Sequence, residues 1–158
     1  MFIAPIPTKY KLITFRSRLE ARWAIYLDSM SIPWEYELEG FNINNDYFYL
    51  PDFYITNFNS ASFYLEVKPT IPAPSYLVML YKFQFLLNQP IYLITGSPSP
   101  ENIFLWSINL IKSIPGENTI HRYFKRDFKL STSKAKELKS MTKACNEKFN
   151  KTKYKRPK

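Results

Sequence analysis

Near its middle the chain reads FYLEVK over residues 63–68, just before a proline-rich stretch. Apolar residues alternate with the rest of this segment, which predicts a β-strand that ends at the first proline. On such a strand Glu66 and Lys68 project from the same face, and the apolar side chains fill the other. A triplet of this kind most often forms only the polar edge of a half-buried strand, so its meaning depends on its neighbours.

A second acidic residue precedes this strand. The dipeptide Pro51-Asp52 places an aspartate 14 residues before Glu66. Phosphodiester hydrolysis needs a hard divalent cation, which activates water and neutralises charge on the phosphate. Carboxylates are suitable ligands for Mg²⁺, and a nearby lysine can orient or deprotonate the attacking water. Asp52, Glu66 and Lys68 are therefore candidate active-site residues.

An amphipathic helix is predicted upstream. Apolar residues recur at spacings of three and four from Phe15 to about Met30, Thr14 or Ser17 can cap the start, and Pro33 prevents continuation. Glu20 lies at the edge of the apolar stripe, where a carboxylate needs a partner. A metal ion is one candidate partner, and a surface ion pair with a neighbouring arginine is the plainer alternative.

The remaining pattern predicts one α/β domain with a basic extension. Residues 1–13 are expected to be an extended lead-in, and residues 102–114 a strand followed by a loop. The other predicted elements are strands over Trp34–Glu39, Tyr47–Leu50 and Ile91–Ile94, a helix over Ser75–Asn88, and a basic amphipathic helix from Ser131 or Ser133 to near Asn150. We expect a mixed central sheet flanked by helices over residues 1–130, and a basic helical extension with a disordered tip over residues 131–158.

The charge of the chain is uneven. It has 22 Lys and Arg residues against 13 Asp and Glu, a formal net charge of +9. Of these, 15 basic and four acidic residues fall within Lys112–Lys158. Such a segment is either a solubilising tail or an arm that binds phosphates.

Cysteine and histidine usage excludes other classes of protein. With only Cys145 and His121, the chain can form neither an internal disulfide nor a structural zinc site of the usual kind. No apolar run approaches the length of a membrane span, and the N-terminus lacks the layout of a secretory signal. We expect a soluble cytoplasmic protein with no membrane partner.

Taken together, these motifs resemble the PD-(D/E)XK nuclease superfamily, which includes restriction enzymes, junction resolvases and some homing endonucleases. The resemblance rests on Pro51-Asp52 followed by Glu66-Val67-Lys68. In addition, FRSRLEARWA at residues 15–24 is similar to the first helix of a phage- and transposon-associated branch, and YLPDFY at residues 49–54 resembles that branch and TnsA-like transposase endonuclease subunits. The likeness covers about residues 9–96, with a weaker echo in the basic helix.

The resemblance implies a restriction-endonuclease-like fold and an active centre of Glu20, Asp52, Glu66 and Lys68. The three acids would hold Mg²⁺, or Mn²⁺ in its place, and Lys68 would position the water. Glu20 matches a glutamate that supplies a further metal contact in that branch. The candidate DNA-binding residues are Arg16, Arg18, Arg22, Lys82, Gln84, Lys134, Lys136, Lys139 and Lys143.

The expected function is metal-dependent cleavage of double-stranded or branched DNA by a homing, nicking or junction-resolving enzyme. A homodimer is the default, because one site per chain cuts one strand. Two alternatives stay open. One is a catalytically inactive nucleic-acid-binding module of the same fold, against which the acids argue, since they repel phosphate unless a cation lies between. The other is an RNA-directed nuclease, which would have the same catalytic core.

Overall fold

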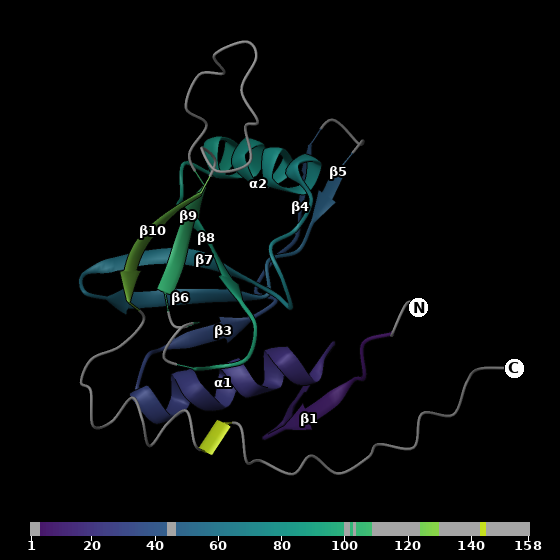
Figure 1. Ribbon diagram of the computed structural model, residues 1–158, viewed down its shortest axis with the longest axis vertical. Helices are drawn as coiled ribbons and strands as arrows, with labels where there is room; N and C mark the ends of the chain where they lie inside the picture. The colour runs from purple at the N-terminus through teal and green to yellow at the C-terminus, as the bar shows by residue number, and fades with distance from the viewer. Residues whose placement is uncertain are drawn as a thin grey trace, which may run out of the picture.

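The computed structural model describes residues 4–43, 47–99, 102, 104–108, 124–129 and 143–144. Along the chain its elements are β1 (Thr8–Tyr10), β2 (Ile13–Phe15), α1 (Arg18–Met30), β3 (Trp34–Tyr36), β4 (Phe41–Ile43), β5 (Tyr47–Tyr49), β6 (Phe53–Phe58), β7 (Ala61–Lys68), α2 (Pro74–Leu87), β8 (Ile91–Thr95), β9 (Phe104–Ile108) and β10 (Phe124–Lys129). Strands and helices are combined in one α/β arrangement, as the sequence predicted (Figure 1).

The main sheet is mixed and mostly antiparallel, with the strand order β10-β9-β8-β7-β6-β3. The strands β3, β6 and β7 pair antiparallel, and β9 and β10 extend the other side in the same way. Among the described strands, β7 and β8 are the one parallel pair, with Tyr64 opposite Ile91 and Lys68 opposite Thr95. Helix α2 connects these two strands, as a parallel crossover requires.

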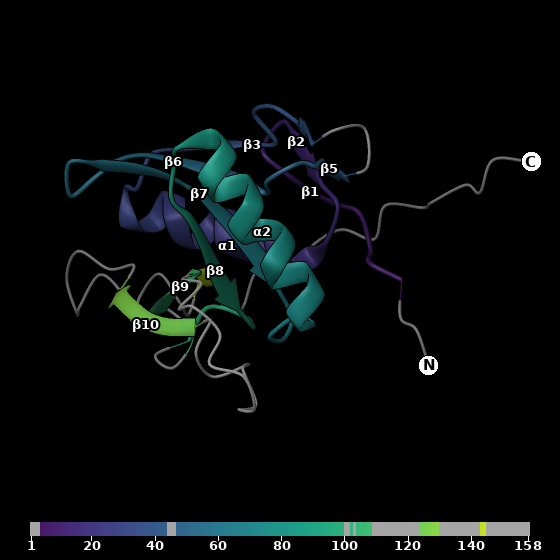
Figure 2. The same ribbon diagram turned by 90° about the horizontal axis from the view of Figure 1, so that it is seen from above.

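The two helices lie on opposite faces of this sheet (Figures 1 and 2). Residues 63–67 of β7 are all buried, and their side chains alternate between the two faces. Phe63, Leu65 and Val67 belong to the core that contains α1. Tyr64 belongs to a second core that contains α2. The predicted two-residue alternation of this strand is therefore confirmed, and it places Glu66 on the face of α2.

Helix α1 begins after Ser17, whose side-chain oxygen accepts a hydrogen bond from the backbone N–H of Glu20 over 3.2 Å. It ends at Met30, because Ser31 adopts the left-handed backbone conformation that closes many helices. Of the two predicted caps, Ser17 is the one used. Trp23 and Leu27 are completely buried in the core against the sheet.

The predicted helix start at Phe15 is wrong. Residues Ile13–Phe15 form β2, which pairs with β1 as an antiparallel hairpin where an extended lead-in was expected. The Phe15 ring is fully buried in the same core as α1 and packs 4.4 Å, centroid to centroid, from the ring of Tyr36. Phe15 thus belongs to the helix's apolar stripe in space, although its backbone is extended.

Helix α2 spans Pro74–Leu87, within one residue of the prediction at each end. Proline is tolerated in the first helical turn, where its missing N–H costs nothing. Leu77, Leu80 and Phe83 are its buried residues. The helix closes at Asn88, which has a left-handed backbone.

The strands before β7 differ from the prediction. The strand that starts at Trp34 ends at Tyr36, because Glu37 has a positive φ of 46°. The segment Tyr47–Tyr49 is extended but pairs with Phe41–Ile43 in a separate hairpin. Its place in the main sheet is taken by Phe53–Phe58, where alternate apolar side chains face the α1 core.

Part of the C-terminal third lies within the described residues. Strand β9 confirms the start of the strand expected over residues 102–114, whereas β10 was not predicted. In the expected basic helix, Lys143 and Ala144 are helical, and Ala144 is buried in the core of α1. Lys134, Lys136, Lys139 and the tip over residues 151–158 lie outside the described residues. In the part of the chain that is described, no helix is both long and apolar enough to cross a membrane.

Candidate active site

Asp52 is held at the start of β6, directly after the buried Pro51. Its side chain is only 2% exposed. Oδ2 accepts a hydrogen bond from the backbone N–H of Val67 over 2.8 Å, and Oδ1 lies 2.6 Å from a terminal nitrogen of the Arg16 guanidinium. The first contact anchors Asp52 to β7, one residue from Glu66.

Glu66 lies in β7 with 1% exposure, on the face covered by α2. Its Oε2 accepts a hydrogen bond from the hydroxyl of Tyr49 over 2.9 Å. Its Oε1 accepts one from the hydroxyl of Tyr76 over 2.5 Å and lies 2.5 Å from Nζ of Lys68. Strand β5, helix α2 and the end of β7 therefore all position this carboxylate.

Lys68 closes β7, and its side chain is 29% exposed. Its ammonium group pairs with Glu66 and lies 5.0 Å from the centre of the Tyr76 ring. The expectation that Glu66 and Lys68 share one face of the strand is confirmed. Their common position is the carboxyl end of the parallel pair β7 and β8, where ligands bind in many α/β proteins.

Glu20 is engaged at the start of α1. Its Oε1 accepts a hydrogen bond from the Ser17 hydroxyl over 2.6 Å, and its Oε2 accepts one from the Tyr36 hydroxyl over 2.6 Å and one from the backbone N–H of Arg16 over 3.1 Å. These contacts resemble a capping box, because the Ser17 side chain accepts from the N–H of Glu20 and the Glu20 side chain reaches back, here to the N–H of the residue before the cap. The partner that the buried position of Glu20 requires is thus supplied within the chain.

Arg16 connects the acidic residues of this site. Its guanidinium pairs with Asp52 and, through Nε over 2.5 Å, with Glu37. Its backbone N–H donates to Glu20. The side chain is 51% exposed, so it lies at the surface above the buried carboxylates. From the sequence Arg16 was expected only as a DNA contact.

The electrostatics of the site follow from burial of like charges. Burial raises the pKa of Asp52 well above its usual range, and the negative charge of Glu66 raises it further, whereas Lys68 acts in the opposite direction. Burial and the Glu66 carboxylate also raise the pKa of the hydroxyls of Tyr49 and Tyr76, which therefore stay protonated and donate. A bound cation would relieve the repulsion between Asp52 and Glu66.

Among the described residues, no group of three His, Cys, Asp or Glu side chains is arranged to hold a metal ion. Glu20, Asp52 and Glu66 thus do not form one such cluster here. Mg²⁺, however, usually keeps several waters and takes only one or two carboxylates together with substrate phosphates. The hard oxygens of Asp52 and Glu66, held beside each other by the contact to Val67, fit that donor set.

Four of the other predicted DNA contacts, Arg18, Arg22, Lys82 and Lys143, lie within the described residues and outside the carboxylate cluster. Arg18 and Arg22 are half-buried on α1, and Arg22 reaches the hydroxyl of Ser97, after β8, over 3.4 Å. Lys82 is exposed on α2 and stacks 5.8 Å from the centre of the Tyr47 ring. Lys143 is exposed. Among the predicted DNA contacts that the structure describes, Arg16 is the one whose side chain contacts a predicted catalytic side chain.

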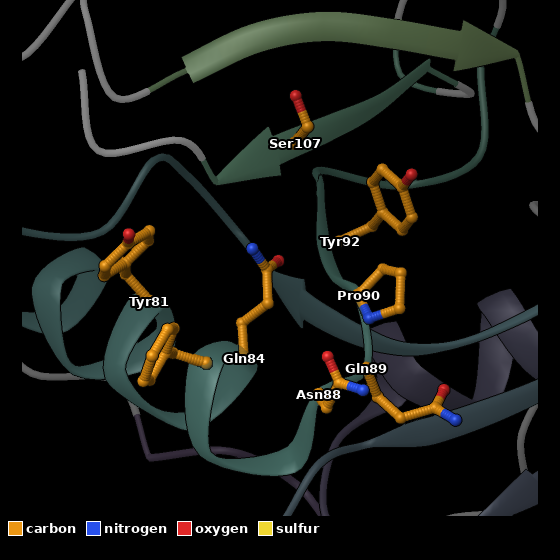
Figure 3. Close-up of a pocket in the computed structure, with 8 residues that line it drawn as sticks. Tyr81, Gln84, Asn88, Gln89, Pro90, Tyr92 and Ser107 are labelled. Atoms are coloured by element: carbon orange, nitrogen blue, oxygen red, sulfur yellow. The ribbon is translucent and has the colours of Figure 1, made fainter.

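Gln84 joins helix α2 to the neighbouring strands through its side-chain hydrogen bonds. Its side chain accepts a hydrogen bond from the N–H of Ile91 over 3.0 Å and donates one to the carbonyl of Ile108 over 3.3 Å. It lines a surface pocket of about 670 Å³, together with Tyr81, Tyr92 and Ser107 (Figure 3). This pocket lies at the start of β8, whereas Lys68 lies beside its end, so the pocket is not part of the carboxylate site.

Sequence reasoning missed the hydroxyl donors of Tyr36 and Tyr76 and the pairing of Arg16 with Asp52. The spacing of Ser17 and Glu20 matches the capping-box pattern and could have revealed the role of Glu20 at the helix start. The contacts of Tyr36 and Tyr76 depend on tertiary packing and leave no local signal.

The comparisons with known proteins add no relative: no family model, no curated protein and no solved structure matches this chain.

Proposed function

We propose that this chain is a metal-dependent endonuclease of the PD-(D/E)XK type, which hydrolyses phosphodiester bonds in double-stranded or branched DNA. One observation carries the proposal. Asp52 and Glu66 are both buried, Asp52 is hydrogen-bonded to the backbone N–H of the residue after Glu66, and Glu66 pairs with Lys68 at the carboxyl end of a parallel strand pair. Burial of two acids beside a lysine is costly for stability alone, and a cation together with a reaction accounts for it.

The order of elements supports the resemblance on which the proposal draws. Along the chain α1 is followed by the antiparallel strands β3, β6 and β7, then by α2 and the parallel strand β8. The helices cover opposite faces (Figure 1). A mixed sheet between helices, with Asp52 before one central strand and Glu66 on the next, is what a restriction-endonuclease-like fold implies.

In this proposal Asp52 and Glu66 hold Mg²⁺, or Mn²⁺ in its place, and Glu20 has a supporting role. The bound ion lowers the pKa of a water molecule and offsets charge on the phosphate. Lys68 positions the attacking water through its ammonium group. Tyr49 and Tyr76 orient the Glu66 carboxylate, so that it offers its oxygens in one fixed direction.

DNA is the proposed partner because of charge. The chain carries a formal net charge of +9, which raises the local concentration of a polyanion. Cleavage of both strands would use two copies of the chain, so we propose a homodimer. The homing, nicking or junction-resolving roles in a phage or mobile element all share this chemistry.

A catalytically inactive nucleic-acid-binding module of the same fold is the second candidate. The observation that favours it is the pairing of Asp52 with Arg16, which compensates the buried charge without a metal ion.

Incubation with DNA distinguishes the two. Supercoiled plasmid, linear duplex and a four-way junction would each be incubated with Mg²⁺, Mn²⁺ or EDTA, beside a single-stranded RNA. We expect metal-dependent DNA cleavage that Asp52→Asn and Glu66→Gln abolish, while DNA affinity stays equal or increases. Glu35→Gln, which neutralises an exposed acid on β3, is the matched control and should cleave normally. Equal cleavage by wild type and Asp52→Asn would refute the assignment, and binding without cleavage by every variant would indicate the inactive module.

A further inference from the structure

Asp52 and Glu66 each have their own cation. Lys68 pairs with Glu66, and Arg16 pairs with Asp52. The two pairs differ in accessibility, because the Arg16 side chain is 51% exposed and that of Lys68 is 29% exposed. The cation on Asp52 is therefore the one that solvent and ligands can reach more easily.

The guanidinium occupies one particular oxygen. Oδ2 of Asp52 is committed to the backbone N–H of Val67, a contact within the sheet that cannot move without disturbing β7. Oδ1 accepts from the Arg16 side chain. A metal ion bound to Asp52 would approach through Oδ1, so the metal ion and the arginine compete for the same oxygen.

Arg16 also has a second anchor. Its Nε pairs with Glu37, whose side chain is 25% exposed, so the guanidinium can leave Asp52 and remain tethered at the edge of the site. A planar guanidinium that is free on one side is well suited to bind a phosphate with two parallel hydrogen bonds.

We propose that Arg16 is an exchangeable counter-cation. It neutralises Asp52 in the metal-free protein, yields Oδ1 to the divalent ion, and then binds a phosphate of the nucleic acid beside the site. The inference rests on the proposed metal-dependent function and adds to it a coupling between metal binding and DNA binding. Because a phosphate draws Arg16 away from Asp52, DNA raises metal affinity, and the metal ion raises DNA affinity by the same factor.

Direct metal binding tests this without relying on cleavage. Mn²⁺ would be titrated into the full chain without DNA, and the free ion followed by electron paramagnetic resonance. Arg16→Gln, which removes the competing charge, should bind Mn²⁺ about fivefold more tightly or better. Arg16→Lys keeps a charge without the second anchor and should lie between. Lys9→Gln removes an exposed positive charge on β1 and should leave the affinity unchanged.

A DNA titration in the presence and absence of Mg²⁺ gives the second readout. Wild type should bind a duplex more tightly with Mg²⁺, and Arg16→Gln should lose most of this gain. Thermal melts of each variant show whether it is folded. If Arg16→Gln does not fold, Arg16→Lys replaces it in both titrations.

The outcomes separate the two proposals. If wild type and Arg16→Gln bind Mn²⁺ equally and only the melting temperature falls, Arg16 is a structural ion pair and the inference is overturned, while the proposed function stands. If neither protein binds Mn²⁺, the metal-dependent function itself fails, and the inference fails with it.

Discussion

The backbone N–H of Val67 donates a hydrogen bond to Oδ2 of Asp52 over 2.8 Å. This contact ties the residue before β6 to the end of β7, the strand that carries Glu66, and it fixes the position of Asp52 relative to Glu66. Since the donor is a backbone group, its placement depends on the pairing of β6 with β7 and not on a flexible side chain. The site is as rigid as the sheet that bears it.

We predict that divalent metal stabilises the protein more at higher pH. Because burial and Glu66 raise the pKa of Asp52, the folded metal-free protein takes up a proton on this carboxylate at a higher pH than the unfolded chain, whose ordinary pKa is about 3.9. Above the folded pKa, Asp52 is ionised and pairs with Arg16. The stability gained from this protonation is complete below the unfolded pKa and is lost as pH rises through the folded pKa. Thermal melts over a series of pH values should show a Mn²⁺-induced shift that grows as the pH rises. Asp52→Asn should show no such growth, and a shift that is the same at every pH in wild type would contradict the prediction.

Lys68→Gln should slow cleavage about 100-fold or more, because the water loses the group that positions it. Metal affinity should stay equal or rise, since Asp52 and Glu66 remain and Lys68 no longer pairs with Glu66. Single-turnover rates at saturating Mg²⁺ measure the chemical step. A rate near that of wild type would show that Lys68 serves only to neutralise Glu66.

Tyr76→Phe should destabilise the metal-free protein by about 1–3 kcal/mol, because it removes a hydroxyl donor from a buried carboxylate. Urea unfolding of Tyr76→Phe, Glu66→Gln and the double variant would give the coupling energy between the two side chains. Tyr47→Phe is the control, as this tyrosine is 48% exposed. Additive effects of the two substitutions would argue against the contact.

Glu20→Gln should reduce cleavage less than Asp52→Asn does, because Glu20 is engaged with Ser17, Tyr36 and the Arg16 backbone. The substitution should cost about 1 kcal/mol of stability through the weakened helix start. Cleavage assays and melts of both variants provide the comparison. Equal losses of activity would make Glu20 a primary metal ligand.

Deletion of residues 151–158 should leave the protein folded and weaken DNA binding. The slope of log affinity against log salt should fall by about 0.9 for each phosphate contact that is lost. Fluorescence anisotropy with a labelled duplex at several salt concentrations measures this slope. An unchanged slope would mean that the tail contributes solubility only.

The sequence predicted the site strand and both helices well, because their signals are local. The alternation around Glu66 and the helical spacing up to Met30 are read directly from neighbouring residues. The prediction from sequence failed where two short apolar segments could each have taken the same place in the main sheet. Tyr47–Tyr49 and Phe53–Phe58 both look like strands, and only tertiary packing decides which one joins the main sheet.

The sequence predicted which acids and which lysine form the candidate site, but not the hydrogen bonds and ion pairs that join them to other residues. The acids and the lysine follow from a short pattern in the sequence. The pairing of Arg16 with Asp52 joins residues 36 positions apart, and no periodicity reports such a contact. The tyrosine donors to Glu66 depend in the same way on how β5 and α2 pack against β7.

The pairing of β6 with β7 has a consequence for the order of folding. This hairpin is local, with Phe58 opposite Ala61 at its turn, whereas the parallel pairing of β7 with β8 must wait for the 14-residue helix α2. Local contacts close fast and distant ones slowly. We therefore expect Asp52 and Glu66 to be brought together early, before Arg16 and α2 arrive to compensate them. The early hairpin would carry two neighbouring negative charges still open to water, and refolding should be faster when high salt or a divalent ion screens them.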